Sequence, residues 1–445
     1  MQPIVQSRRI ARPRLRRALA LALCLLPLLA VCGREPGPGH GPRAPAATPA
    51  PAPVVAPWAL PAPPGAAQPD LVRAPDGRLL LSWLEPVETA GHRLQLAATV
   101  PGSGRWEPTL TVAQGSDWFV NWADTPRIHA LDDGSLWAHW LESTGPSRMD
   151  YGIALARSGD AGRTWERTAP VHPRSRGDHG FVTFWAQGRD RLGLAWLDSR
   201  QKATAAAAAT GGHEAHAGHH AGGAPMMLRA AVHAADGHQQ AEWPLDGSTC
   251  DCCTTGSART AQGVVVVYRG RDAGEIRDTR IVRLQEDGTW TAPREVHRDG
   301  WHFAGCPVNG PAVAADGRQV WVAWYTEADG QPELRAARSN DAGASFAAPV
   351  TLARGPRVLG RVALAAGGGQ LLAAWLEESG RDTQQLQLAR YRPDLSAPVR
   401  AAVATLQARG RASGMPRLQW ADGAAWLAWT EVEDGAPVLR GAVVR

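Results

Sequence analysis

The sequence predicts an all-β fold, a β-propeller of seven four-stranded blades, and three observations support this prediction. A short phrase occurs seven times, in which a glycine-containing turn is followed by an apolar run, an aromatic residue and a polar group. The aromatic residues are Trp83, Trp140, Trp196, Tyr268, Trp324, Trp375 and Trp429. Their spacings of 57, 56, 72, 56, 51 and 54 residues indicate one repeat, because the single long interval holds a low-complexity insert. Repeats of about 40–55 residues that carry strands are typical of propellers.

The first repeat, residues 69–112, shows how each blade is expected to form. Four strands are expected in LVRAP, RLLLSWL, HRLQLAATV and PTLTV, with turn residues between them. Alternating and β-branched apolar residues favour strands, and Asp-Gly pairs favour turns. The seventh repeat stops after its third strand, so its fourth strand is expected from Pro53–Leu60. Such a strand would close the ring and cover an open sheet edge.

Two turns between third and fourth strands carry an Asp-box pattern, in which serine, aspartate, glycine and an aromatic residue recur at fixed spacing. Their residues are Ser158, Asp160, Gly162 and Trp165 in the second repeat, and Ser339, Asp341, Gly343 and Phe346 in the fifth. The aspartate can accept hydrogen bonds from amides of its own turn, and glycine tolerates a positive φ. We therefore expect these boxes to be structural.

Asp boxes in a repeat of this length resemble those of the sialidase-like, Asp-box propeller superfamily, and the resemblance covers residues 70–445. The segment Pro126–Leu131, PRIHAL, is similar to the (F/Y)RIP segment of sialidases, with His129 in the place of proline. In that family this arginine helps to bind the substrate carboxylate. Sialidases have six blades, so six is the alternative to the seven repeats counted here.

Three arginines are expected to meet at the mouth of the central channel, because each begins the first strand of a blade. They are Arg127, Arg361 and Arg417. Three guanidinium groups can hold a carboxylate, as the resemblance to sialidases implies. Alternatively, each arginine pairs with an acid at the end of a neighbouring second strand. The candidate acids are Glu85, Glu142, Glu377 and Glu431.

The resemblance also implies a tyrosine nucleophile activated by a glutamate, together with a carboxyl acid/base. Tyr268 and Glu275 in the fourth repeat have the required residue types, and Asp198 or Asp272 could supply the acid. However, Tyr268 occupies the aromatic position of the repeat, which favours a place in the core. Both interpretations remain open at this point.

Four cysteines precede the first strands of blades four and five, so we expect them to cluster at one rim. They are Cys250, Cys252, Cys253 and Cys306. In an exported protein they could form two disulfides. Alternatively, C-x-C-C with a fourth cysteine could bind a soft transition metal, with His302 as a further ligand.

An insert at residues 202–227, between the second and third strands of blade three, is rich in histidine and ends with two methionines. Its candidate metal ligands are His213, His216, His219, His220, Met226 and Met227. Imidazole and thioether ligands suit copper, which is therefore the metal expected if one binds. A solvated loop with incidental histidines is the alternative.

The N-terminus predicts export. Six arginines precede the apolar run Ala18–Val31, and Cys32 follows in LLAVCG, which resembles a lipobox. Residues 1–32 are thus expected to be a signal and residues 33–66 a Pro/Ala-rich tether, with the propeller at residues 67–445. Removal of the signal takes the formal net charge from +5 to −1, which leaves no case for nucleic acid as a partner. An ordinary secretory signal is the alternative.

Three classes of function remain open. The first is an exported lipoprotein, in the periplasm or on the cell surface, that binds a small molecule, a glycan or copper at the face opposite the Asp boxes. The second is an exo-α-sialidase or a related glycoside hydrolase. The third is an assembly scaffold. The fold alone does not distinguish among them.

Overall fold

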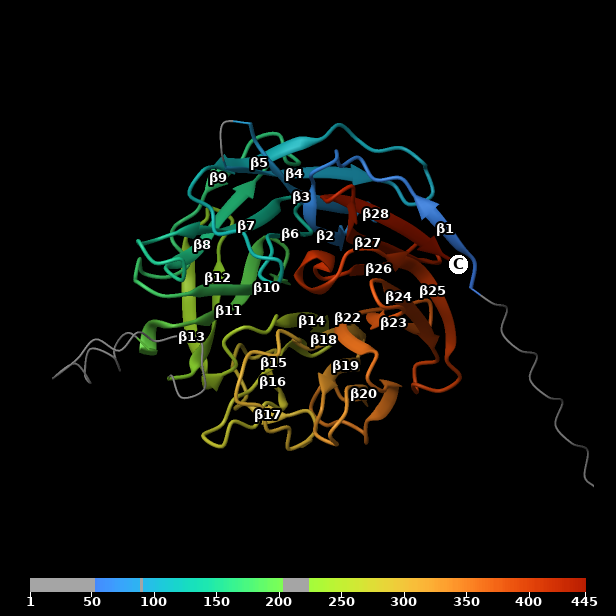
Figure 1. Ribbon diagram of the computed structural model, residues 1–445. Helices are drawn as coiled ribbons and strands as arrows, with labels where there is room; N and C mark the ends of the chain where they lie inside the picture. The colour runs from blue at the N-terminus through green and yellow to red at the C-terminus, as the bar shows by residue number, and fades with distance from the viewer. Residues whose placement is uncertain (1–52, 89–90, 203–223) are drawn as a thin grey trace, which may run out of the picture. The chain divides into compact units, whose positions relative to one another are not determined.

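The computed structural model describes residues 53–88, 91–202 and 224–445, which form a seven-bladed β-propeller (Figure 1). Each blade is a four-stranded antiparallel sheet whose strands follow one another in sequence, except where the ring closes. The prediction of seven four-stranded blades is confirmed, and the six-blade alternative is wrong. The signal, Cys32 and most of the tether and insert lie outside the described residues.

The strands of the first four blades have these bounds. Blade one holds β2 (Ala67–Arg73), β3 (Leu79–Pro86), β4 (His92–Thr99) and β5 (Leu110–Gly115). Blade two holds β6 (Arg127–Ala130), β7 (Leu136–Ser143), β8 (Tyr151–Ser158) and β9 (Glu166–Arg167). Blade three holds β10 (His179–Gln187), β11 (Arg191–Asp198), β12 (Met226–His233) and β13 (Gln239–Thr249). Blade four holds β14 (Gly256–Thr260), β15 (Gly263–Arg269), β16 (Thr279–Leu284) and β17 (Arg294–Glu295).

The remaining blades follow the same plan. Blade five holds β18 (Ala312–Asp316), β19 (Gln319–Thr326), β20 (Glu333–Ser339) and β21 (Val350–Arg354). Blade six holds β22 (Val358–Gly367), β23 (Gln370–Glu378), β24 (Gln384–Tyr391) and β25 (Val399–Leu406). Blade seven holds β26 (Arg417–Ala421), β27 (Ala424–Glu433), β28 (Ala436–Val444) and β1 (Val55–Trp58).

The ring is closed by pairing between the two ends of the described chain. Strand β1 pairs antiparallel with β28, with Val55 opposite Val444 and Trp58 opposite Gly441. The innermost strands β2, β6, β10, β14, β18, β22 and β26 each contact the next one around the ring. Among the described residues, no helix is long and apolar enough to cross a bilayer.

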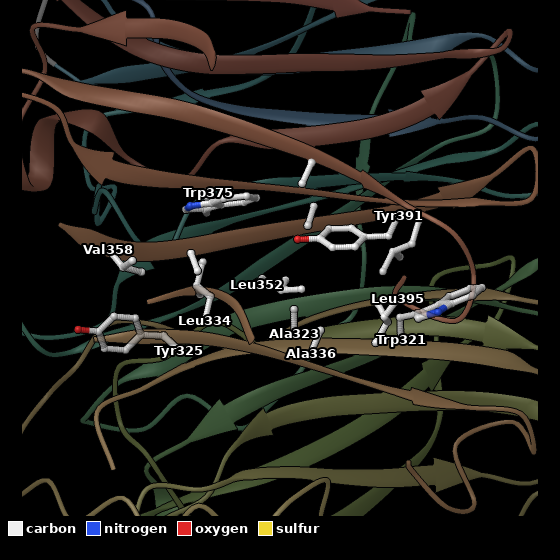
Figure 2. Close-up of a cluster of buried hydrophobic side chains, with 14 of the residues drawn as sticks. Trp321, Ala323, Tyr325, Leu334, Ala336, Leu352, Val358, Trp375, Tyr391 and Leu395 are labelled. Carbon is white, nitrogen blue, oxygen red and sulfur yellow. The ribbon is translucent and has the colours of Figure 1, made fainter. Parts of the chain in front are cut away.

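The core consists of apolar clusters between neighbouring blades. Figure 2 shows one of them, in which Trp321 and Leu334 of blade five lie near Trp375 and Tyr391 of blade six. Trp321 and Trp375 are at most 1% exposed. Flat aromatic rings bury a large apolar area per residue, which suits the space between two twisted sheets.

The polar group that follows the aromatic in the repeat has a structural role. Residues two positions apart in a strand point to the same face of the sheet. The acid two positions after a tryptophan can therefore accept a hydrogen bond from its indole N–H. This hydrogen bond occurs in four blades. The pairs are Trp83–Glu85 at 3.4 Å, Trp140–Glu142 at 2.8 Å, Trp196–Asp198 at 2.8 Å and Trp375–Glu377 at 2.7 Å.

The Asp boxes form the expected turns. In the first, the amide of Thr164 donates to Asp160 Oδ1 at 2.9 Å, and the amide of Gly162 donates to Ser158 Oγ at 2.8 Å. The indole of Trp165 donates to the carbonyl of Gly162 at 3.0 Å. These hydrogen bonds to the charged form hold the pKa of Asp160 at about 2. Glycine adopts positive φ in both boxes, with 91° at position 162 and 79° at position 343.

We predict that Gly343→Ala destabilises the propeller more than Gly288→Ala does. Both glycines have positive φ, near 80°, which costs alanine about 1–2 kcal/mol. A Cβ at position 343 would also lie 2.9 Å from Val265 Cγ1 of blade four, whereas position 288 is open. Such overpacking adds roughly 1–3 kcal/mol. Urea unfolding measures both changes, and equal losses would show that the box does not pack tightly on the preceding blade.

Candidate functional site

A cavity of about 270 Å³ lies at the centre of the propeller, where the innermost strands begin. It is lined by residues of all seven blades, including Arg127, Arg361 and Arg417. The structure therefore brings together the three arginines for which a shared position was expected. Closure of the ring is the cause, because it places the starts of the first strands around one axis.

Asp70, Arg127 and Arg417 lie at one level of this cavity. In the strand pairing, each is opposite the residue that precedes the repeat aromatic of its own blade. Blades seven, one and two are consecutive around the ring, so the three side chains are neighbours. The resulting group contains two guanidinium groups and one carboxylate.

Asp70 is shared between these two arginines. Its Oδ1 lies 3.9 Å from Arg127 Nη1 and 3.5 Å from Arg417 Nε, and its Oδ2 accepts the amide of Ile128 at 3.1 Å. Arg417 also donates to Thr125 Oγ1 at 2.6 Å. Burial, with Arg127 nearby, lowers the pKa of Arg417 to about 10. One carboxylate therefore offsets only part of the positive charge at this level.

Arg361 enters the cavity from a β-bulge. The pairing of β22 with β23 shifts its register between Gly360 and Ala363, and Arg361 takes a φ of 56°. Comparable register shifts occur in β2 and β10, where Gln68 has a φ of 56° and Phe181 a φ of 53°. Bulges redirect side chains, and a left-handed conformation is costly for residues other than glycine. The fold thus holds the Arg361 side chain in a position that a regular strand would not provide.

The guanidinium of Arg361 has only neutral partners. Its nitrogens donate to Ser413 Oγ at 2.7 Å, to the carbonyl of Gly414 at 3.0 Å and to the carbonyl of Gly410 at 2.6 Å. It also lies over the ring of Trp122, at 4.5 Å from the centroid. No carboxylate forms an ion pair with it in the described part of the chain. Burial accordingly lowers the pKa of Arg361 to about 10.

The alternative pairing of these arginines with acids at the ends of second strands is wrong. Those acids are engaged within their own blades or by backbone. Glu85 binds Arg93, Glu142 binds Arg167, Glu377 accepts the indole of Trp375, and Glu431 accepts the amides of Gln407 and Ala408. None of the four acids lines the cavity.

Tyr268 lies in the core and does not line the cavity. It is 0% exposed, packs in an apolar cluster between blades three and four, and donates to Asp246 Oδ2 at 2.7 Å. Glu275, expected to activate it, instead pairs with Arg271 at 2.6 Å and Arg277 at 2.5 Å. The tyrosine and the glutamate required for nucleophilic attack therefore interact with other residues: Tyr268 with an aspartate, and Glu275 with two arginines.

The candidate acids Asp198 and Asp272 also lie outside the cavity lining. Asp198 is buried beside His179, with 3.4 Å between His179 Nδ1 and its Oδ2, and it pairs with Arg200 at 2.8 Å. Asp272 accepts two amides of its own turn. Among the described lining residues, Asp70 is the one carboxylate, whereas most glycosidases use two. The catalytic set implied by the sialidase resemblance is not assembled.

The four cysteines meet between the approaches to blades four and five. Cys250 Sγ lies 4.0 Å from Cys252 Sγ and 3.5 Å from Cys253 Sγ, and the three sulfurs all lie within 4.8 Å of one another. Cys306 is exposed, and its thiol interacts with that of Cys252. All four are free thiols in the described structure.

The thiols differ in their affinity for protons. Hydrogen bonding with Cys252 and Cys253, together with the charge of Arg277, holds the pKa of Cys250 well below its usual range. Hydrogen bonding to Cys250 raises the pKa of Cys252, and burial raises that of Cys253. The charged form is thus favoured at Cys250, at the centre of the group.

The other expected metal ligands are not part of this thiol group. His302 is exposed and lies outside the set of ligand atoms described above. Met226 is buried in β12 as part of the core, and the sulfur of Met227 lies 3.9 Å from Arg229 Nη1. The four histidines of the insert lie outside the described residues: His213, His216, His219 and His220.

Sequence reasoning missed two acids near the cavity. Asp70 was recognisable, because it precedes Trp83 by the same thirteen residues that separate Arg127 from Trp140. Asp124 lies in the connection before β6, is 2% exposed and accepts the amide of Phe181 at 2.8 Å. Burial raises the pKa of Asp124 to about 7. No sequence signal distinguishes this aspartate, because its burial depends on packing against blade three.

No protein-family model matches the chain, and no curated protein matches it. Among solved structures, the polysaccharide lyase Uly1 is similar over 86% of this chain and 90% of the lyase, with 10% identity and a TM-score of 0.53. An α-L-arabinofuranosidase mutant from Fusarium graminearum matches over 86% and 93%, with 12% identity and a TM-score of 0.45. Trypanosoma rangeli sialidase in complex with sialic acid matches over 72% and 53%, with 14% identity and a TM-score of 0.40. At these identities the likeness is one of fold.

We predict that Asp124→Asn raises the free energy of unfolding, relative to the wild type, by more at pH 8 than at pH 5. An acid whose pKa rises from its ordinary 3.8 to about 7 on folding contributes less stability as the pH increases through that interval. Asparagine is neutral throughout and keeps the shape of the protonated acid. Denaturant unfolding at both pH values measures the change, and the exposed Asp117→Asn serves as control. An effect of Asp124→Asn that does not vary with pH would contradict the prediction.

Proposed function

We propose that this protein is an exported propeller that binds a small anionic ligand, with a carboxylate as the recognised group, in its central cavity. The observation that carries the proposal is the convergence of Arg127, Arg361 and Arg417 on a cavity with one carboxylate, Asp70. A ligand carboxylate would supply the missing negative charge. Guanidinium groups are suited to this task because they bind carboxylates through two parallel hydrogen bonds.

The arrangement of the three arginines supports a small ligand held from two sides. Arg127 and Arg417 share Asp70 on one side, while Arg361 reaches the cavity from blade six without an acidic partner. The cavity volume of about 270 Å³ is just below the range for ligand pockets, roughly 300–1,000 Å³, so only a small ligand would fit. A single sugar acid is a ligand of suitable size and charge.

Glycoside hydrolysis is the second candidate, favoured by the Asp boxes, the PRIHAL segment and the arginines. Against it stand the burial of Tyr268 and the single carboxylate among the described lining residues. Binding without turnover is therefore the function that this geometry supports best.

We predict that the protein binds an acidic sugar and not its neutral counterpart. Loss of one charge-assisted hydrogen bond costs about 1.5–3 kcal/mol, so Arg361→Gln should weaken the binding of sialic acid or galacturonic acid by about 10- to 100-fold. Arg93→Gln is the matched control, because Arg93 pairs with Glu85 outside the cavity lining. Titration calorimetry with galacturonic acid and galactose measures the difference.

Equal affinity for galactose and galacturonic acid, or an Arg361→Gln variant that binds as well as the wild type, would contradict this proposal. Rapid release of a fluorophore from a sialoside would favour hydrolysis instead. In that case Tyr268→Phe would test the nucleophile implied by the sialidase resemblance.

We also propose that the protein is anchored to a membrane by acylation of Cys32, most suitably to the outer membrane, because Gly33 rather than aspartate follows. One acyl chain alone gives marginal membrane binding, so a second acyl group on the same terminus is expected. Mass spectrometry of the mature N-terminus should find a lipid-modified cysteine, and Cys32→Ser should release the protein from the membrane fraction. An unmodified N-terminus at another residue would exclude this anchor, and Cys24→Ser is the control.

A further inference from the structure

The three clustered thiols of the blade-four approach have the arrangement of a metal site that is independent of the cavity ligand. We propose that Cys250, Cys252 and Cys253 bind one monovalent copper ion in three-coordinate geometry, and that Cys306 transfers the ion to them from solvent. The proposal rests on sulfur geometry, on a gradient of exposure and on the charge around the site.

The sulfur triangle has the size that a bound metal requires. A metal–sulfur bond of about 2.3 Å places two sulfurs of one coordination sphere roughly 3.8–4.0 Å apart. The observed separations from Cys250 Sγ are 4.0 Å to Cys252 and 3.5 Å to Cys253, with the third edge below 4.8 Å. Only small shifts of the side chains would be needed to centre an ion among them.

Three-coordination favours copper over zinc. Thiolates are soft ligands that select monovalent copper, zinc or iron–sulfur clusters. Structural zinc is almost always bound by four ligands in a tetrahedron. Here the compact group contains three cysteines, and no histidine or carboxylate of the described chain joins it at the same spacing. Cys306 interacts with Cys252 but lies outside the triangle, which leaves three sulfurs for the ion.

Exposure decreases from the rim to the site. Cys306 is exposed, Cys252 is half-buried, and Cys250 and Cys253 are at most 1% exposed. An ion captured by Cys306 can pass to Cys252 by exchange of one thiolate for another, with each thiol losing its proton as it binds. Burial of the final two ligands excludes water and would slow release of the ion.

The charge around the triangle offsets part of the charge of a thiolate–copper complex. Three thiolates and one monovalent ion carry a net charge of −2. Arg277 acts electrostatically on Cys250, and its side chain is only 4% exposed. Arg271 is 8% exposed and lies 3.7 Å from Asp251, the residue between the first two ligands. Both arginines also pair with Glu275, and Lys202 pairs with Asp251 at 2.7 Å. Three cations thus face two acids beside the thiols, and the one remaining positive charge reduces the cost of burying the negative complex.

The test uses the full chain, reduced and kept free of oxygen, with monovalent copper as the probe and a coloured copper chelator as competitor. The wild type should bind one copper, with three sulfur neighbours in X-ray absorption. Cys250→Ser should lower the affinity by more than about 100-fold, because even outer-shell changes cost about 10- to 100-fold. Cys252→Ser, at the least buried ligand, gives a second variant should Cys250→Ser fail to fold.

Cys306→Ser separates the transfer role from ligation. It should keep one copper with three sulfurs but take up copper at least about tenfold more slowly, and Cys32→Ser should behave as the wild type. A fourth sulfur that disappears in Cys306→Ser, or a preference for zinc over copper, would overturn the three-coordinate site. Absence of free thiols at these positions in denatured, unreduced protein would show that the four cysteines form two disulfides and not a metal site. Loss of copper on deletion of residues 211–222 would place the ligands in the histidine-rich insert instead.

Discussion

Pairing of β1 with β28 is the constraint on which the rest of this propeller depends. Seven blades contact only their neighbours, so an unpaired edge at the seventh blade would leave the ring open where the chain ends meet. Closure also sets the positions of the innermost strands. Asp70 of blade one and Arg127 of blade two come from consecutive blades, whereas Arg417 of blade seven reaches Asp70 only because the last blade returns to the first.

Charge is distributed unequally between the blades and the centre. Within the blades, the acids that follow the repeat tryptophans bind partners of their own blade. Glu142, for example, accepts the indole N–H of Trp140 and forms an ion pair with Arg167. At the centre, three arginines line a cavity with one acid, Asp70, which pairs with Arg127 and Arg417 but not with Arg361. This imbalance is costly without a ligand, because buried charges are stabilised mainly by partners of opposite sign. The bulge at Arg361 adds a backbone cost at the same place, as strained residues at ligand sites often do.

The thiol group and the cavity share one connection. The residues that follow Cys253, Thr254 and Thr255, line the cavity, and Thr255 donates to the carbonyl of Phe181 at 2.6 Å. The segment is further restricted at Gly310, where a side chain would collide with Thr254. A rigid connection of this kind holds the cysteines in place from one end while its other end forms the wall of the cavity.

The sequence alone determined the architecture, because period, turn residues and strand patterns are local signals that repeat seven times. It also determined that Arg127 and Arg417 begin first strands and that four cysteines precede consecutive blades, whereas Arg361 is the fourth residue of its strand. Only the tertiary structure decided which side chains reach the cavity. Tyr268 matched the residue type of a nucleophile, yet its repeat position faces the core. Asp124 and the bulge at Arg361 depend on packing between blades, and such long-range contacts leave no local pattern in the chain.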